Sequence, residues 1–282
     1  MEVLKKNRRL KDLVKLILRL INRVKEDDLF GTASQLAYSL LVAFFPFIIF
    51  LMTVIGNSNL EEEVVLNYLS RVLPGEAFSL VENTVVEVLN HENIGLLSFS
   101  LIFAIWSASR GIVAIIKSLN KAYDEEEKRG FFERYAVSFF STIIFAFAIL
   151  LVLIAFVLGN VIKNALMEYL PEPELIAGLW QLLRYTLGIG MIVLTFAVVY
   201  HFTPSRRLGW KEVFPGAIAA SIGWIFTSIA FSFYVNNFAN YTRFYGSIGA
   251  IIILLTWLYL SSFIILLGGE INAMVSKNLR DK

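Results

Sequence analysis

The sequence predicts an all-α, polytopic membrane protein with six transmembrane helices, both chain ends in the cytoplasm, an amphipathic N-terminal helix and an outer helical hairpin. Three observations support this fold class. Hydrophobic residues make up 57% of the chain and charged residues 17%, whereas a soluble domain is about 45–50% apolar and about 25% charged. Apolar stretches long enough to cross a bilayer recur along the chain. Lys and Arg lie mostly in alternate connections between these stretches.

The six predicted spans are each bounded by charged or turn-forming residues. They run from Thr32 to Ile55, Ile94 to Ile116, Ser138 to Gly159, Gly178 to Tyr200, Phe214 to Val235, and Ser247 to Leu267. Together they form one membrane domain, residues 32–268, followed by a cytosolic tail, residues 269–282.

The distribution of positive charge predicts the orientation. Twenty Lys and Arg lie in residues 1–31, in the second and fourth connections, and in the tail, whereas the alternate connections hold three. Because Lys and Arg in short loops are retained in the cytoplasm, these four segments are predicted to be cytoplasmic.

Residues 1–31 contain a basic, amphipathic segment. Apolar residues recur from Leu10 to Val24 at helical spacing, with Lys and Arg available for the other face. This pattern predicts a helix on the inner leaflet, either as a topology anchor or as a site for anionic lipids. Nucleic acid is not an expected partner.

The first outer connection, residues 57–93, is long and acidic, with seven Glu and one Arg. Pro74 and Gly75 divide two amphipathic runs, which predicts a helical hairpin outside the membrane. It would cap an outward-facing cavity or act as a packed lid.

Charges and helix breakers inside the spans supply the functional candidates. Arg110 lies about two turns before the inner end of the second span, where a charge costs a few kcal/mol unless it snorkels or is paired. Glu270 is an acid at a comparable depth. Pro46 removes a backbone donor within the first span and is expected to kink it. Pro215 is expected in the first turn of the fifth span, where proline is tolerated.

These considerations give a set of candidate cavity or substrate-binding residues, with no catalytic or metal-binding residues and no cofactor. The set is Gln35, Tyr38, Pro46, Trp106, Ser107, Arg110, Arg243, Tyr245, Gly249 and Glu270. Glycines including Gly190, Gly216 and Gly223 are interpreted as positions where helices approach closely.

Several catalytic designs find no support in the sequence. The chain has no Cys and two His, so neither a thiolate nor a multi-histidine metal site can be built. It also lacks the phosphate-binding loop of P-loop ATPases, the H-E-x-x-H motif of zinc proteases and the G-x-S-x-G motif of serine hydrolases.

Several segments together resemble the YihY/BrkB family of bacterial inner-membrane proteins, over residues 25 to 275. The segments are Ala33 to Tyr38 leading to Phe45-Pro46, Trp106-Ser-Ala-Ser, Trp210 to Gly216, Tyr241 to Gly249 followed by Leu255 to Tyr259, and Gly269 to Ala273. The resemblance implies a six-helix inner-membrane protein without a settled activity. Some members carry a ribonuclease BN label, for which this chain offers no cluster of acids or histidines; others carry a virulence label.

Three functions are compatible with the sequence. The leading hypothesis is a transporter or translocator of an anionic lipid or amphipathic solute, with membrane lipids as partners, because an intramembrane arginine suits an anionic headgroup. The second is a scaffold for an envelope-assembly complex, with envelope-assembly proteins as partners. The third, less favoured, is an intramembrane enzyme.

Overall fold

In the computed structural model, helices are the only regular secondary structure among the residues that it describes. Those residues are 14–15, 17–56, 70, 78, 94–144, 147, 173–206, 208–238 and 247–280. The predicted hairpin at 57–93, apart from two residues, and the candidates Arg243 and Tyr245 lie outside them.

Five long helices account for most of the described structure. They are α2 (Leu29–Gly56), α5 (Ile94–Ala122), α7 (Pro173–Phe202), α8 (Trp210–Phe238) and α10 (Ser247–Arg280). Two shorter helices cover residues 17–26 and 131–144. Within this part of the chain, three segments are long and apolar enough to cross a membrane: Gln181–Phe202, Trp210–Asn237 and Ile248–Lys277. The number of spans, six, stays a prediction.

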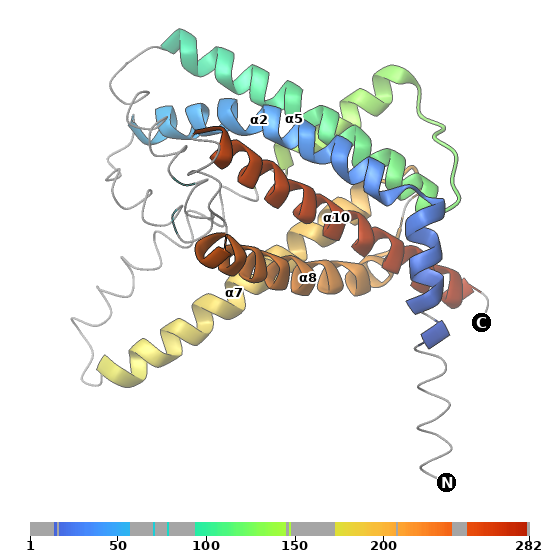
Figure 1. The fold of residues 1–282 in the computed structure, drawn as a ribbon. Helices are drawn as coiled ribbons and strands as arrows, with labels where there is room; N and C mark the ends of the chain where they lie inside the picture. Colours follow the sequence, from blue (N-terminus) through green and yellow to red (C-terminus); the bar gives the residue numbers. More distant parts are fainter. Residues whose placement is uncertain are drawn as a thin grey trace.

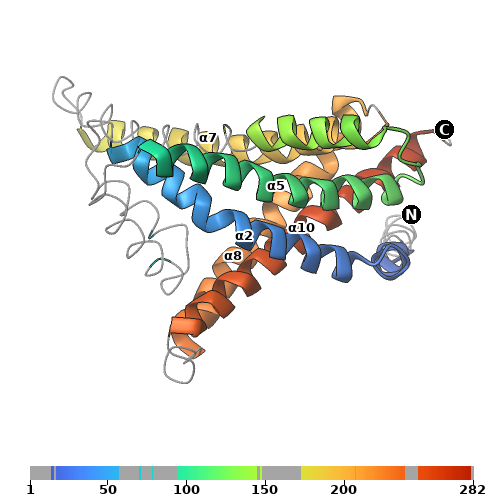
Figure 2. The ribbon, with the colours of Figure 1, turned by 90° about the horizontal axis from the view of Figure 1, so that it is seen from above.

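The long helices pack as a bundle in which α10 is central. It packs along both α2 and α8, while α5 packs along α2 and α7 packs along α8 (Figure 1). Seen from above, α8 diverges from α2 and α5 (Figure 2). Most of the buried apolar residues join into one cluster contributed by all five long helices.

Four segments that are distant in sequence meet at one end of this bundle. They are residues 17–28, the connection after α5 (residues 123–130), the connection after α7 (residues 203–206) and the C-terminal turns of α10 (Figures 1 and 2). These segments belong to the parts of the chain that carry most of the Lys and Arg. We therefore call this end of the bundle the basic end. The four segments predicted to share one side of the membrane therefore share one end of the fold.

The chain reverses direction at the end of α5 through a residue with a positive φ, a backbone conformation that normally favours glycine. Asp124 has a φ of 55°. The Asp124 amide donates to the Lys121 carbonyl at 3.1 Å, and the Glu125 amide donates to the Asn120 carbonyl at 2.9 Å. These two bonds are those of a Schellman motif, which satisfies carbonyls at the end of a helix. They turn the chain back across the basic end.

The start of α8 differs from the sequence prediction. The fifth span was expected to begin at Phe214, but α8 begins at Trp210, because the Glu212 carboxylate accepts a hydrogen bond from the Gly209 amide (2.8 Å) and caps an earlier first turn. Pro215 therefore lies in the second turn. The Gly216 amide donates to Asn272 Oδ1 of α10 at 2.6 Å.

Glycines permit the close crossing of α8 and α10. A Cβ atom added to Gly216 would overlap the carbonyl oxygen of Gly268, and a Cβ added to Gly223 would lie 3.1 Å from Ile264. These two glycines confirm the interpretation made from sequence. The same interpretation is wrong for Gly190, where a Cβ would meet nothing within 4 Å, because its helix face packs on no described neighbour.

The last helix continues well beyond the predicted span. α10 is helical to Arg280, so residues 269–280 extend the same helix, with Glu270, Ala273 and Ser276 buried. Likewise α2 continues through Pro46 to Gly56.

Candidate functional site on α5 and at the basic end

Arg110 is exposed on the surface of α5 instead of lining an enclosed cavity. Its guanidinium carbon lies 4.8 Å from the centroid of the Trp106 ring, in a cation–π contact. Trp106 itself is 52% exposed. Both side chains therefore lie on the outer surface of the described bundle.

Arg110 belongs to a row of cations on one face of α5. Lys117 and Lys121 follow it by seven and eleven residues, which are spacings that return to the same helix face, and both are exposed. The row runs from within the predicted span to the basic end. It is a surface along which negative charge can be stabilised at more than one depth.

Gln35 and Tyr38 on α2 lie at the level of Arg110. Gly111, the next residue along α5, packs against Leu36 and Ser39 of α2. Gln35 and Tyr38 are both exposed, Tyr38 by 64%. The structure thus places Gln35, Tyr38 and Arg110 at a similar position along the α2–α5 pair.

The remaining described candidates are not gathered with Arg110. Ser107 is buried, and its hydroxyl has no hydrogen-bond partner among the described residues. Gly249 is buried in the first turn of α10. It is twenty-one residues from Glu270, roughly 30 Å along the helix at about 1.5 Å per residue, so one compact site cannot contain both.

Glu270 is fully buried and pairs with Arg23, a residue that the sequence did not single out. Arg23 Nη1 donates to Glu270 Oε2 at 3.1 Å and to the Ala122 carbonyl at 2.7 Å. One guanidinium therefore joins the N-terminal helix, α5 and α10. Among the described residues, the ion-pair partner of Glu270 is therefore Arg23 and not Arg110.

A second acid, Asp27, lies beside Arg23 and Lys121. Its amide donates to the Arg23 carbonyl at 2.9 Å, and its Oδ1 lies 3.8 Å from Lys121 Nζ. Lys121 also donates to the Glu26 carbonyl at 2.7 Å. Arg23, Lys121 and the two acids form an ion cluster at the joint between the N-terminal helix and the bundle.

A small pocket opens beside this cluster. It is lined by Arg23, Ala122, Tyr123, Asp124, Glu125, Ala273 and Lys277. Burial, followed by the charge of Glu212, raises the pKa of the Tyr123 phenol well above its ordinary value. The Tyr123 hydroxyl is buried and has no hydrogen-bond partner in the described part of the chain.

Comparison with known proteins gives the family. The model of a family described as virulence factor BrkB matches residues 20–282. The chain belongs to the BrkB family of membrane proteins. A putative ribonuclease-like protein, YfkH of Bacillus subtilis, is 42% identical to this BrkB-family chain over 245 residues, 87% of this chain and 89% of the relative.

More distant relatives are named as membrane proteins. A UPF0761 membrane protein of Alteromonas mediterranea is 28% identical over 280 residues, 93% of this BrkB-family chain and 88% of the relative. One from Pseudoalteromonas atlantica is 23% identical over 273 residues, 90% and 84% of the two chains. No solved structure matches.

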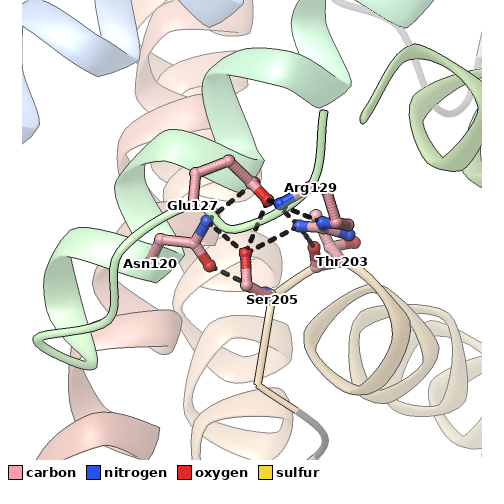
Figure 3. Close-up of polar contacts among 5 residues, drawn as sticks. All are labelled: Asn120, Glu127, Arg129, Thr203 and Ser205. Atoms are coloured by element: carbon pink, nitrogen blue, oxygen red, sulfur yellow. Dashed lines mark hydrogen bonds and ion pairs between the residues drawn. The ribbon is translucent and has the colours of Figure 1, made fainter. Parts of the chain in front are cut away.

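The BrkB-family chain contains a second polar network that sequence reasoning missed (Figure 3). Glu127 accepts hydrogen bonds from Arg129 Nε (2.8 Å), Asn120 Nδ2 (2.9 Å) and Ser205 Oγ (2.9 Å). Arg129 Nη2 also donates to the Thr203 carbonyl at 3.1 Å. The network joins the connection after α5 to the connection after α7. Sequence alone gives no signal for this network, because an acidic run flanked by Lys and Arg, such as the one that contains Glu127, is typical of a solvated loop.

The charge of Glu127 is stabilised by its partners. Burial would raise the pKa of Glu127, but the hydrogen bonds from Arg129 and Ser205 outweigh burial and lower the pKa to about 2. The carboxylate and its donors satisfy one another. We therefore assign this network a structural role and place the candidate chemistry at the other cluster and on α5.

Proposed function

We propose that this BrkB-family protein is a translocator that moves an anionic lipid, or another anionic amphipath, across the bacterial cytoplasmic membrane. The observation that supports the proposal is that Arg110 is exposed on the surface of α5, at a position that the sequence predicts to lie within a transmembrane span. A charge at the centre of a bilayer costs about 2.5–3.5 kcal/mol on insertion scales. A lipid phosphate that reaches Arg110 would offset this cost by a charge-assisted hydrogen bond.

The surroundings of Arg110 suit an amphipathic substrate. Trp106 holds the guanidinium by a cation–π contact, which orients it without neutralising its charge. Lys117 and Lys121 continue the same face toward the basic end. A headgroup would move along this row while its acyl chains stay in the hydrocarbon, so no enclosed cavity is needed.

The orientation follows from the positive charge at the basic end. Placing this end in the cytoplasm puts the row of cations on the inner half of the membrane. Headgroups of the anionic inner leaflet would then encounter Lys121 and Lys117 before Arg110.

The ribonuclease-like name of the Bacillus subtilis relative is not part of this proposal. In the described residues, no three His, Cys, Asp or Glu side chains are grouped as a metal site requires. Phosphodiester hydrolysis by bound metal ions needs such ligands.

The test compares two charge-removing variants on one helix face. Arg110→Gln and Lys117→Gln each remove one positive charge from exposed α5 positions two turns apart. Transbilayer movement of fluorescent anionic and zwitterionic lipids is measured in proteoliposomes that contain equal amounts of folded protein. Because Arg110 is predicted to lie deeper in the membrane than Lys117, we expect Arg110→Gln to slow the anionic lipid about tenfold or more, and Lys117→Gln to slow it less than threefold, where about 1.4 kcal/mol corresponds to tenfold.

A different pattern would contradict the proposal. Equal rates for wild type and Arg110→Gln, with both proteins folded, would remove Arg110 from the pathway. Absence of movement of either lipid in wild type would favour the scaffold.

A further inference from the structure

We propose that the N-terminal helix, residues 17–26, is a membrane-binding surface that lies among the lipid headgroups at the basic end and prefers anionic lipid. Its ligand is the lipid phosphate layer together with the outermost part of the acyl chains. Membrane binding by this helix does not depend on the proposed translocation.

The first observation is an apolar face that the rest of the described chain leaves uncovered. Val14, Ile17, Leu18 and Ile21 are each exposed by 47–55%. Their spacings of three and four residues place them on one side of a helix. Four large apolar side chains side by side are unfavourable in water, and such a face is typical of helices that lie in the interface of a bilayer.

Polar contacts fix which side of the helix faces outward. Arg23 donates to Glu270 Oε2 at 3.1 Å and to the Ala122 carbonyl at 2.7 Å, and the next residue, Val24, is buried. These contacts hold that side of the helix against α5 and α10. The four apolar residues lie on another side, so docking of the helix leaves them outward.

The direction of the helix suits a position along the membrane surface. In Figure 1 it runs across the direction of α2 and α10, and Figure 2 looks down its axis. Asp28, with a φ of 49°, makes the turn into α2, and its Oδ1 accepts a hydrogen bond from the Gly31 amide at 3.3 Å. Because α2 is predicted to cross the membrane, a helix that runs across its end lies along the membrane surface.

Positive charge beside the apolar face identifies the occupant as anionic lipid. Lys15, Arg19 and Lys25 are exposed, and residues 14–25 contain no Asp or Glu. A helix of this kind buries its apolar side chains at the headgroup boundary while its cations contact phosphates. The position at the end of the predicted spans favours lipid over a soluble protein as the occupant.

The membrane-binding surface adjoins the row of cations on α5. Lys121 Nζ donates to the Glu26 carbonyl at 2.7 Å, so the last turn of the N-terminal helix lies against the cation of the row that is nearest the basic end. Anionic lipid gathered by the helix would therefore enter the row at Lys121. This consequence rests on the proposed function, whereas membrane binding does not.

Spin labels on single cysteines test the orientation of the helix, because the chain has no cysteine of its own. Ile17→Cys lies on the apolar face, and Asn22→Cys lies at an exposed polar position. The full chain is placed in nanodiscs of phosphatidylcholine and phosphatidylglycerol. Each label is then exposed to oxygen, which concentrates in the bilayer, and to a water-soluble nickel chelate. We expect the label on Ile17→Cys to be relaxed mainly by oxygen and the label on Asn22→Cys mainly by the chelate.

A fluorophore on Ile21→Cys tests the lipid preference. Nitroxide-labelled phosphatidylglycerol should quench it more strongly than nitroxide-labelled phosphatidylcholine at the same concentration. Arg19→Gln should lower this preference by up to about fivefold, because one cation near an anionic surface is lost. Lys211→Gln is the matched control, since it removes an exposed cation at the start of α8, and it should leave the preference unchanged.

Each of three results would overturn the proposal. Equal access of the chelate to both spin labels would place the helix in water. Protection of the label on Ile17→Cys from both reagents would identify a protein, or a second copy of this chain, as the occupant. Equal quenching by the two lipids would remove the anionic preference. These measurements involve no lipid movement, so failure of membrane binding and failure of translocation are distinguishable.

Discussion

Single side chains at the basic end show how polar contacts across long sequence separations position the helices. Arg23 reaches Glu270, which is 247 residues away along the chain. The sequence indicated that Glu270 is unusual, because it is an acid at the end of an apolar span. It could not indicate Arg23 as the partner, because Arg23 is one of several similar cations in an amphipathic segment and only the docking of that helix selects it.

The Glu127 network predicts a pH-dependent contribution to stability. Glu127 is 20% exposed and its pKa is lowered from 4.5 to about 2. Its contribution is therefore present above about pH 4.5 and is lost as the pH falls toward 2. Allowing for partial exposure, we expect Glu127→Gln to lower the free energy of unfolding by about 2 kcal/mol at neutral pH.

Thermal unfolding in detergent measures this effect. The exposed neighbour Glu126 provides the matched control, and Glu126→Gln should unfold like wild type. The difference between wild type and Glu127→Gln should shrink as the pH is lowered below about 4.5. A difference that is unchanged at acidic pH would contradict the assigned role of the charge.

Between helices, the tightest constraint lies where α8 crosses α10. Gly216 faces the backbone of Gly268, and its amide binds Asn272. The sequence predicted a close approach here from small residues and also predicted one at Gly190, where no described helix comes close. Composition alone cannot separate the two, because a glycine permits close packing but does not show whether a neighbouring helix is present.

This contrast gives a matched pair of glycine substitutions. Gly216→Ala should destabilise the fold by about 2–4 kcal/mol, because its Cβ would overlap a backbone oxygen that cannot move away alone. Gly190→Ala should be neutral or slightly stabilising, because the space is open and alanine favours the helix. To compare the two variants, each is heated, and size-exclusion chromatography then measures how much protein remains monodisperse and folded. Equal stability of the two variants would contradict the crossing geometry.

For the whole molecule, the charge pattern was the most informative part of the sequence. It predicted that the N-terminus, two connections and the C-terminus lie together, and the structure brings parts of all four to the basic end. Helix boundaries were predicted less well. α8 begins four residues before the predicted span because of a capping contact between Gly209 and Glu212. α10 continues beyond the predicted span because neighbouring segments bury its last turns, and a hydropathy profile carries no information on such contacts.

The side of the membrane can be determined with single cysteines at the basic end. Glu126→Cys and Lys277→Cys place thiols at exposed positions in two of the four segments. We expect both to be protected from a membrane-impermeant maleimide in intact spheroplasts and labelled after permeabilisation, because positively charged loops stay in the cytoplasm. Labelling of only one position in intact cells would contradict the common location of these segments, and labelling of both would reverse the orientation.

The proposed function depends first on whether the protein itself moves lipid. The measurement is the rate of transbilayer movement of a fluorescent anionic lipid in proteoliposomes, as a function of the amount of wild-type protein and beside vesicles that contain Arg110→Gln. A rate that rises with wild-type protein and falls with loss of the Arg110 charge is the predicted result. A rate equal to that of protein-free vesicles at every protein density would contradict translocation by this chain.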